Sequence, residues 1–345
     1  MQLTTDRLTI RMLSREDVTA FTHYRKLPAV ARYQGWPRPY TRDLAHELVD
    51  EMDALDGPTP DAWVQLALDE GGRLVGDVAV WLDTDADLAM IGYTLDPQHQ
   101  GRGLAVEAVE AVIEWLFGEL KVHRVAATID PLNLPSARVL ERCGFEYVGT
   151  ARSSALIDGE WTDDARFSLL APDWAAWTER ETEPPDRVDL VEITDANLEA
   201  VLGVHGSFSQ RRLVAPVLHS LAQALVPPVE DGESIRPWYR GVSADGAMVG
   251  FVMVAEPTTV RPDPELWRLL IDRHHQGRGI GTRVVEAIVE RRAQAGDTRL
   301  TVRYAPDGAG SPARFYERLG FVPSGDFDGG EMIASLELSR FNSTS

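Results

Sequence analysis

A glycine-containing motif occurs twice in this chain, and its two copies start 176 residues apart. Residues 100–105 read Gln-Gly-Arg-Gly-Leu-Ala, and residues 276–281 read Gln-Gly-Arg-Gly-Ile-Gly. The same offset separates the pairs Gly144-Phe145 and Gly320-Phe321. Landmarks that recur in one order indicate a duplicated domain. A period this long excludes a solenoid, whose repeats span roughly 20–50 residues, and it fits two globular domains of about 100–200 residues each.

Composition restricts the partners of these domains. The chain carries a net charge of −20, and both of its halves are acidic. We therefore expect no nucleic-acid partner, since an acidic surface repels phosphate. Acidic charge favours cationic or amine-bearing molecules, although it also serves plain solubility. The single cysteine, Cys143, excludes an internal disulfide and a cysteine metal site, and we expect no metal. No signal sequence or 18-residue apolar run is present, so we expect a soluble cytoplasmic protein with no membrane partner.

Periodic patterns predict the same order of elements in both halves: a strand, helices, antiparallel strands, a strand followed by the motif and a helix, then a strand, a helix and a strand. This order predicts an α/β domain with a mixed sheet in each half. Residues 179–186 are charged and contain Pro184-Pro185, which is typical of a linker. We expect a first domain over 1–175, a linker over 176–187 and a second domain over 188–345.

Each copy of the motif lies where a strand passes directly into a helix. Glycines let a backbone approach a ligand closely. The free N–H groups of the first helical turn then form a site for phosphate or pyrophosphate. The loop could also be only a tight strand-to-helix turn. A dinucleotide fingerprint is excluded because its third glycine would fall at Val106 or Thr282, and no Gly-Lys-Ser/Thr of a P-loop is present.

Both loops resemble the Gln/Arg-x-x-Gly-x-Gly/Ala signature of the GNAT (Gcn5-related N-acetyltransferase) superfamily, whose loop binds the pyrophosphate of acetyl-coenzyme A. The Gly-Phe pairs resemble the superfamily's turn after the second coenzyme-contacting helix. The resemblance implies two tandem GNAT-fold domains that use acetyl-CoA, or another acyl-CoA, as acyl donor. The coenzyme-binding residues that it implies are Leu95, Gln100, Gly101, Arg102, Gly103, Leu104, Ala105 and Asn133 in the first half, and Leu270, Ile271, Gln276, Gly277, Arg278, Gly279, Ile280 and Gly281 in the second.

The two halves resemble different branches of the superfamily. The first half, with Ile91-Gly92-Tyr93 and the stretch 133–140, resembles the ribosomal-protein N-terminal acetyltransferases. The second half, with 267–272 and 315–321, resembles the bacterial spermine/spermidine acetyltransferases. The implied acceptor is a small-molecule or peptide amine. The sequence leaves open which amine it is, the length of the acyl chain, and whether the protein is a monomer or a homodimer.

Acyl transfer from a thioester to an amine needs a deprotonated amine, a stabilised oxyanion and a proton for the leaving thiolate. The resemblance implies that a backbone N–H near Leu95 or Leu270 faces the oxyanion. It also implies that Tyr316, four residues before Gly320, donates the proton to the thiolate. The first half has Leu140 at that position.

The first half instead offers Asn133 and Ser136, which resemble the asparagine and serine that contact coenzyme A and the leaving sulfur in the ribosomal branch. The second half has Ala309 and Pro312 at these two positions.

Carboxylates are the candidate general bases, because a lysine-like amine has a pKa of about 10.4 in water and must lose a proton. The candidates are Glu265 and Glu331 in the second half and Asp158 and Glu160 in the first. Each of them could instead be a solvated loop carboxylate.

We therefore expect an N-acyltransferase, with acetyl as the expected acyl group, that works by direct attack of a primary amine through a tetrahedral intermediate. The alternative is that only one half is catalytic, while the other binds acyl-CoA or shapes the acceptor site. A coenzyme-A-binding regulator without turnover is a third possibility.

Overall fold

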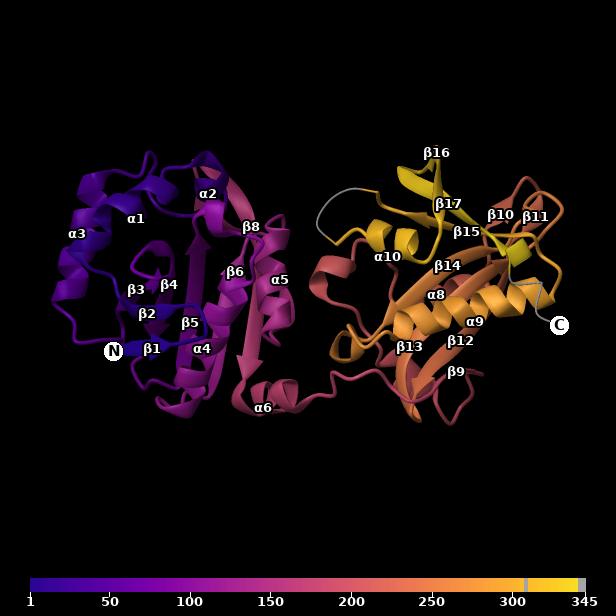
Figure 1. Cartoon of the computed structure of the whole chain (residues 1–345), viewed down its shortest axis with the longest axis horizontal. Helices are drawn as coiled ribbons and strands as arrows, with labels where there is room; N and C mark the ends of the chain where they lie inside the picture. The colour runs from indigo at the N-terminus through magenta and orange to yellow at the C-terminus, as the bar shows by residue number, and fades with distance from the viewer. Residues whose placement is uncertain (307–309, 341–345) are drawn as a thin grey trace. The chain divides into compact units, whose positions relative to one another are not determined.

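The computed structural model describes residues 1–306 and 310–340 and divides the chain into two compact units (Figure 1). The first unit is Met1–Glu179, and the second starts at Arg180. Each unit has one mixed sheet with helices packed against it. The expected α/β class and the tandem arrangement are confirmed.

The sheet of the first unit has the strand order β1-β2-β3-β4-β5-β6-β8-β7. The strands are β1 (Gln2–Thr4), β2 (Thr9–Met12), β3 (Trp63–Asp69), β4 (Leu74–Leu82), β5 (Leu88–Leu95), β6 (Arg124–Ile129), β7 (Glu146–Ile157) and β8 (Glu160–Leu170). The helices are α1 (Val18–Arg25), α2 (Pro28–Ala31), α3 (Arg42–Asp53), α4 (Leu104–Gly118), α5 (Leu134–Arg142) and α6 (Ala171–Glu179). Neighbouring strands are antiparallel except for the parallel pair β5 and β6.

The second unit repeats this plan with the order β16-β17-β15-β14-β13-β12-β9. Its strands are β9 (Val188–Val191), β12 (Arg236–Ala244), β13 (Ala247–Glu256), β14 (Glu265–Ile271), β15 (Arg299–Tyr304), β16 (Val322–Asp328) and β17 (Glu331–Glu337), with a separate ribbon of β10 (Val229–Glu230) and β11 (Glu233–Ser234). Its helices are α7 (Leu198–Leu202), α8 (Val217–Leu225), α9 (Ile280–Gln294) and α10 (Ala313–Arg318). Here β14 and β15 form the parallel pair.

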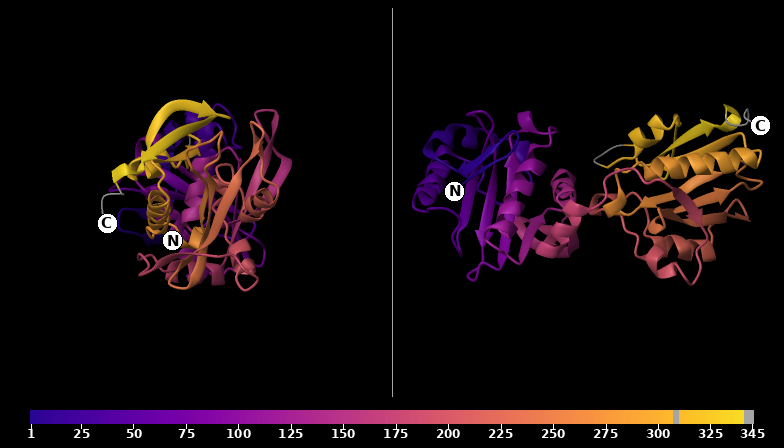
Figure 2. Two further views of the ribbon diagram at one scale, coloured as in Figure 1. Left: turned by 90° about the vertical axis from the view of Figure 1, so that its right-hand side faces the viewer. Right: turned by 60° about the horizontal axis from the view of Figure 1, so that its bottom comes forward.

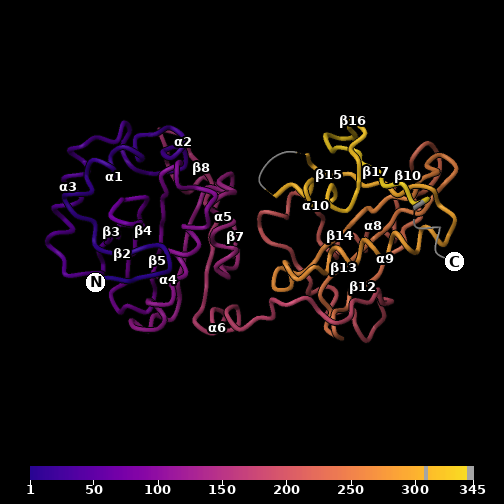
Figure 3. Tube along the Cα trace, in the orientation of Figure 1, coloured from indigo at the N-terminus to yellow at the C-terminus, as the bar shows by residue number. Residues whose placement is uncertain are grey.

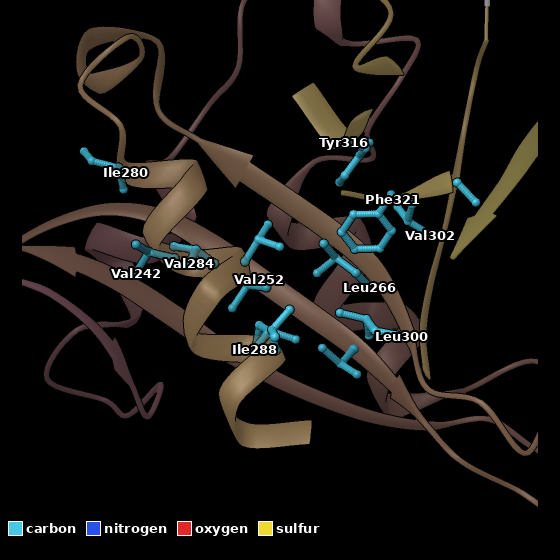
Figure 4. Packing of buried hydrophobic residues seen from close by; sticks show 14 of the residues in the cluster. Val242, Val252, Leu266, Ile280, Val284, Ile288, Leu300, Val302, Tyr316 and Phe321 are labelled. Atoms are coloured by element: carbon cyan, nitrogen blue, oxygen red, sulfur yellow. The ribbon is translucent and has the colours of Figure 1, made fainter. Parts of the chain in front are cut away.

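Helices cover both faces of the second unit's sheet (Figure 2), and a cluster of buried hydrophobic side chains lies on each face. Helix α9 buries Ile280, Val284 and Ile288, which recur at helical spacing, against one face. Figure 4 shows these side chains beside those of β13 and β14. On the other face, residues of α7 and α8 pack against Phe251 and Leu270. This layering fixes the start of α9 at the carboxyl end of β14.

In both units the parallel strands diverge after a short paired stretch. β5 pairs with β6 only from Leu88 to Met90, and β14 pairs with β15 only at Glu265 and Leu266. The rest of β5 and β14 therefore has a main-chain edge that the parallel neighbour does not use. This divergence opens beside the repeated glycine motif.

A glycine in the neighbouring antiparallel strand holds each diverging strand close on its other side. A Cβ atom at Gly76 of β4 would lie 2.4 Å from the carbonyl oxygen of Thr94, and one at Gly250 of β13 would lie 2.7 Å from that of Leu270. Any side chain there would displace backbone. The Val-Gly pairs at 75–76 and 249–250 thus have the same structural cause.

The segment between the units departs from the expected linker. Helix α6 continues to Glu179, and its Trp177 is buried against Gly144 and donates a hydrogen bond from Nε1 to the carbonyl of Arg142 at 3.0 Å. Residues 176–179 are therefore part of the first unit. Residues 180–187, traced in Figure 3, carry no helix or strand. Charge and proline content could not reveal that a tryptophan docks the preceding helix.

Candidate functional site

Both glycine loops take the conformation that an anion site requires. Gly101 and Gly103 have φ values of 76° and 83°, and Gly277 and Gly279 have values of 83° and 77°. Side chains with a Cβ rarely adopt this left-handed conformation. In the described part of the chain, no backbone carbonyl accepts a hydrogen bond from the N–H groups of 101–106 or 277–282. Each loop thus offers unpaired donors at the positive end of a 15-residue helix.

The glutamine that begins both copies of the motif has the same structural role in each. Gln100 donates from Nε2 to the carbonyl of Leu95 at 3.1 Å, and Gln276 donates to the carbonyl of Ile271 at 2.9 Å. Gln276 also donates to Oε1 of Gln210 at 2.8 Å. The glutamine side chains therefore tie each loop to the end of its strand, and their contribution to a ligand site is to position the loop.

The two loop arginines are bound to other parts of the protein. Arg102 donates from Nη1 to Oε2 of Glu70 at 2.8 Å. Arg278 is only 4% exposed, forms an ion pair of 2.7 Å with Glu181 and donates from Nε to the carbonyl of Glu183 at 2.8 Å. A pyrophosphate group would have to compete with these acceptors for the two guanidinium groups.

An aspartate before each loop was missed by sequence reasoning. The side chain of Asp96 accepts a hydrogen bond from the N–H of Gln98 at 3.0 Å, and Asp272 accepts one from that of His274 at 3.0 Å. Asp272 also accepts from the N–H of His205 at 3.0 Å. Burial alone would raise the pKa of Asp272, but the hydrogen bonds from His274 and His205 lower it to about 2. The repeat could have revealed this pair, because Asp96 and Asp272 are separated by the same 176 residues as the two glycine motifs.

A cavity of about 780 Å³ lies in the second unit where β14 and β15 diverge. The glycine loop borders one part of it, and Tyr316 and Glu331 border others. The cavity brings together every candidate of the second half except Arg278: Glu265, Leu270, Ile271, Gln276, Gly277, Gly279, Ile280, Gly281, Tyr316 and Glu331. Pro312 also lines this cavity, whereas Ala309 lies outside the described residues.

Tyr316 lies within an aromatic cluster at the cavity wall. Its ring stacks on Tyr304 with centroids 5.5 Å apart and meets Phe315 and Phe321 edge-on (Figure 4 labels Tyr316 and Phe321). No hydrogen-bond partner of its hydroxyl is found among residues 1–306 and 310–340. Burial raises the pKa of Tyr316 above its ordinary value. The phenol therefore stays protonated at neutral pH, although burial makes it a weaker acid than a free tyrosine.

The two glutamates of the cavity differ in their surroundings. Glu265 is buried, and its oxygens accept hydrogen bonds from Arg303 at 2.8 and 3.1 Å and from Arg261 at 3.2 Å. Glu331 is exposed at the start of β17, and the described part of the chain holds no ion-pair partner for it. A carboxylate that two guanidinium groups occupy is poorly placed to accept a further proton, which favours Glu331 as base.

The first unit joins Ser136 to a tyrosine. Ser136 donates from Oγ to the hydroxyl of Tyr93 at 2.9 Å, and that hydroxyl donates to the carbonyl of Ser136 at 2.7 Å. Burial raises the pKa of Tyr93. Asn133 caps α5 by accepting from the N–H of Ser136 at 3.3 Å, and Leu140 is fully buried. A phenol thus reaches α5 from β5, a contact across 43 residues that spacing could not predict.

The two first-half base candidates lie at the turn between β7 and β8. Asp158 is exposed and ion-paired with Arg38, and Glu160 is the first residue of β8. Among the described residues, no group of three or more His, Cys, Asp or Glu side chains could hold a metal ion. In the same residues, we find no helix with the length and apolar character needed to span a membrane.

Two family models, both described as "Acetyltransferase (GNAT) domain", match this sequence, one at residues 7–146 and the other at 239–323. Probable N-acetyltransferase YjcK of Bacillus subtilis is 44% identical over 103 residues, which are 29% of this chain and 57% of that protein. [Ribosomal protein uS5]-alanine N-acetyltransferase of Escherichia coli is 39% identical over 84 residues, which are 24% of this chain and 43% of that protein. These matches span about half the length of the curated relatives.

Among solved structures, a GNAT-family acetyltransferase from Bacillus anthracis is 25% identical and aligns with 50% of this chain and 99% of its own, at a TM-score of 0.43. The family matches fall separately in the two units, and each contains one of the glycine loops. The chain therefore belongs to the GNAT acetyltransferase family and has one domain of that family in each unit.

Proposed function

We propose that the second unit transfers an acyl group, with acetyl as the first candidate, from acyl-CoA to a primary amine. The observation that carries this proposal is the single cavity that connects the glycine loop to the phenol of Tyr316. Membership of the GNAT family and the N-acetyltransferase names of the relatives support the reaction class.

The coenzyme binds along the loop and the diverging strand. The N–H groups of 277–282 donate hydrogen bonds to the pyrophosphate, and the positive end of α9 stabilises its negative charge. The pantetheine arm follows the edge of β14 that β15 leaves unpaired after Leu266. The thioester then lies between Leu270 and Tyr316, which line the same cavity. This arrangement holds the reacting carbonyl on a rigid strand.

The reaction exchanges one bond for another. The amine nitrogen attacks the thioester carbon and forms a C–N bond, while the oxygen becomes an oxyanion that a main-chain N–H near Leu270 stabilises. The carbon–sulfur bond then breaks. Tyr316 gives its proton to the thiolate and regains one from solvent, and Glu331 takes the proton of the amine directly or through water. The products are an amide and coenzyme A.

The first unit is proposed to bind the same coenzyme, because its loop has the same backbone geometry. Its Tyr93–Ser136 pair is the group that could give a proton to a thiolate there, since Leu140 has none to give. Whether that unit turns over or only binds is decided by the experiment below.

The test compares matched substitutions in the two loops. Gly103→Val and Gly279→Val should each remove about one equivalent of acetyl-CoA binding in calorimetry, because valine does not tolerate φ near 80°. The rate of thiol release in the presence of an amine should fall further in Gly279→Val than in Gly103→Val. Gly296→Val, at another left-handed glycine with no neighbour within 4 Å, is the control for general destabilisation. Greater loss in Gly103→Val would assign the chemistry to the first unit.

A further inference from the structure

The cavity of the second unit contains a guanidinium group that forms no ion pair with any carboxylate of residues 1–306 and 310–340. Arg268 of β14 donates from Nη1 to the carbonyl of Trp267 at 2.7 Å and from Nη2 to Oε1 of Gln223 at 3.3 Å. Its Nε is buried and has no hydrogen-bond partner. Within the described part of the chain, no carboxylate forms an ion pair with it. Two neutral acceptors thus fix its orientation and leave its charge unpaired.

The two arginines that pair with Glu265, Arg303 and Arg261, are compensated. Arg303 pairs with Glu265 at 2.8 Å and also with Asp328, and Arg261 pairs with Glu265 at 3.2 Å and also with Glu230. Burial lowers the pKa of Arg268, and the charges of Glu331 and Glu265 oppose this shift. Arg268 is of intermediate exposure, and a charge that is partly withdrawn from water without a counter-charge is costly to keep. Such groups are common where a ligand supplies the missing charge.

The position of Arg268 places it among the reacting groups. It lies on the diverging part of β14, two residues before Leu270, and lines the same cavity as Tyr316 and Glu331. It also reaches Gln223 of α8, which covers the sheet face opposite α9. Glu331 and Glu265 act on it electrostatically without forming an ion pair. The first unit has Gly92 at the matching repeat position, so this charge is particular to the second unit.

We propose that Arg268 binds a carboxylate carried by one of the two reacting molecules in the second-unit cavity. This inference rests on the proposed acyl transfer in that unit. The carboxylate has two possible sources: an acceptor that is an amino acid, whose ammonium group would face Glu331, or the acyl group of a dicarboxylic acyl-CoA. An unpaired guanidinium repels a polycation, so a carboxylate-bearing molecule would suit Arg268 better than a polyamine.

The test measures ratios of kcat/KM so that general damage cancels. In the acceptor arm, glycine, β-alanine and γ-aminobutyrate are each compared with their carboxamides, with acetyl-CoA as donor. The carboxamide amine loses its proton more readily, so intrinsic reactivity works against the expected preference. In the donor arm, succinyl-CoA is compared with acetyl-CoA. One arm should favour the carboxylate by about 10- to 100-fold, the usual effect of a charge-assisted hydrogen bond.

Arg268→Gln should bring that ratio close to one, and Arg268→Lys should retain part of it, because lysine keeps the charge but not the planar fork. Arg240→Gln is the matched control. Arg240 also donates to the preceding carbonyl, at 2.8 Å, and lies 4.8 Å from the ring centroid of Trp238, but it is ion-paired with Glu192 and does not line the cavity. The carboxylate preference should be the same in Arg240→Gln as in the unaltered protein.

Calorimetry on the full chain separates failure of this inference from failure of the transfer reaction. If thiol is released but neither arm prefers a carboxylate, or if Arg268→Gln keeps the preference, the carboxylate site is refuted and the transfer reaction stands. If no amine releases thiol, yet β-alanine or succinyl-CoA binds in an Arg268-dependent way, the carboxylate site stands and the proposed reaction fails.

Discussion

Tyr316 combines a packed ring with an unpartnered hydroxyl, so its two contributions can be separated by one substitution. Tyr316→Phe keeps the contacts with Tyr304, Phe315 and Phe321 and removes only the proton donor. We expect kcat to fall by about 10²–10⁴-fold, the usual contribution of general acid catalysis. The thermal unfolding midpoint should change little. Thiol release under saturating acyl-CoA and circular dichroism measure the two effects.

Tyr304→Phe serves as the comparison, since it alters the stacked neighbour in the same cavity. Its kcat should exceed that of Tyr316→Phe. Equal turnover of Tyr316→Phe and the unaltered protein would assign protonation of the thiolate to water, or the chemistry to the first unit.

For single residues, the sequence proposes candidates that hold a recognisable place in a motif. It gives no sign of candidates that only their contacts in the fold reveal. Tyr316 stays a prediction that rests on the family resemblance, since the first copy has Leu140 at the same distance from its Gly-Phe pair. Tyr93 matters through its bonds to Ser136 on α5, and Arg268 through the absence of an acidic partner in a cavity. Neither property follows from a spacing of residues in the sequence. Glu265 is a candidate base in the sequence, and only the fold shows that two arginines pair with it.

Among the elements, the short turn before α9 depends on one aspartate. Asp272 accepts N–H bonds from His205 and His274, and its pKa is lowered from 3.8 to about 2. A depressed pKa stabilises the fold above the unfolded-state value and loses that contribution as pH falls through the folded value. The stability gap between the unaltered protein and Asp272→Asn should thus be full at neutral pH and close between about pH 4 and pH 2.

Urea unfolding at a series of pH values, followed by circular dichroism, measures this gap. Asp96→Asn is the matched change in the first unit, where the carboxylate accepts a hydrogen bond from the N–H of Gln98. We expect a smaller loss of stability from it. A gap for Asp272→Asn that stays constant down to pH 2 would contradict the assigned cause.

The strand glycines offer a second element-scale prediction. Gly250→Ala places a Cβ 2.7 Å from the Leu270 carbonyl, so β14 must move and both stability and turnover should fall. Overpacking of this kind typically costs about 1–3 kcal/mol in the free energy of unfolding. Gly281→Ala is the control, because its Cβ would make only ordinary contacts, with Phe315 at 3.5 Å and Ile271 at 3.9 Å, and the matching residue of the first loop is already Ala105. Urea denaturation checks both, and equal effects would argue against the close approach.

Element order was predictable because hydrophobic periodicity and the repeat acted together. Helices α4 and α9 begin directly after the glycine motifs, as expected. Tertiary contacts decided what periodicity could not. Trp177 extends α6 beyond residue 175, and the carbonyls of Glu183 and Pro185 in the supposed free linker accept hydrogen bonds from Arg278 and Arg283.

The whole molecule carries a net charge of −20, whereas the second-unit cavity has an unpaired arginine. Long-range attraction follows the total charge, and selection at the site follows the local charge. The acidic composition alone predicted a cationic acceptor. The cavity changes this expectation, because a molecule attracted from a distance by the surface is not the one that Arg268 would retain.

This distinction can be read from the effect of salt on KM. The Debye length falls from about 30 Å at 0.01 M salt to about 8 Å at 0.15 M, so distant charges are screened while contacts within a cavity persist. For spermidine, a polycation, KM should rise with salt because its attraction to the acidic surface is lost. For β-alanine, which has no net charge at neutral pH, KM should stay nearly flat. Acyl-CoA is an anion, and its association rate should increase as its repulsion from the acidic protein is screened.

Initial rates at a series of salt concentrations and at saturating concentrations of the other substrate provide these values. A KM for β-alanine that rises in parallel with that for spermidine would mean that its ammonium group alone is recognised, and the guanidinium of Arg268 would then have no part in acceptor binding.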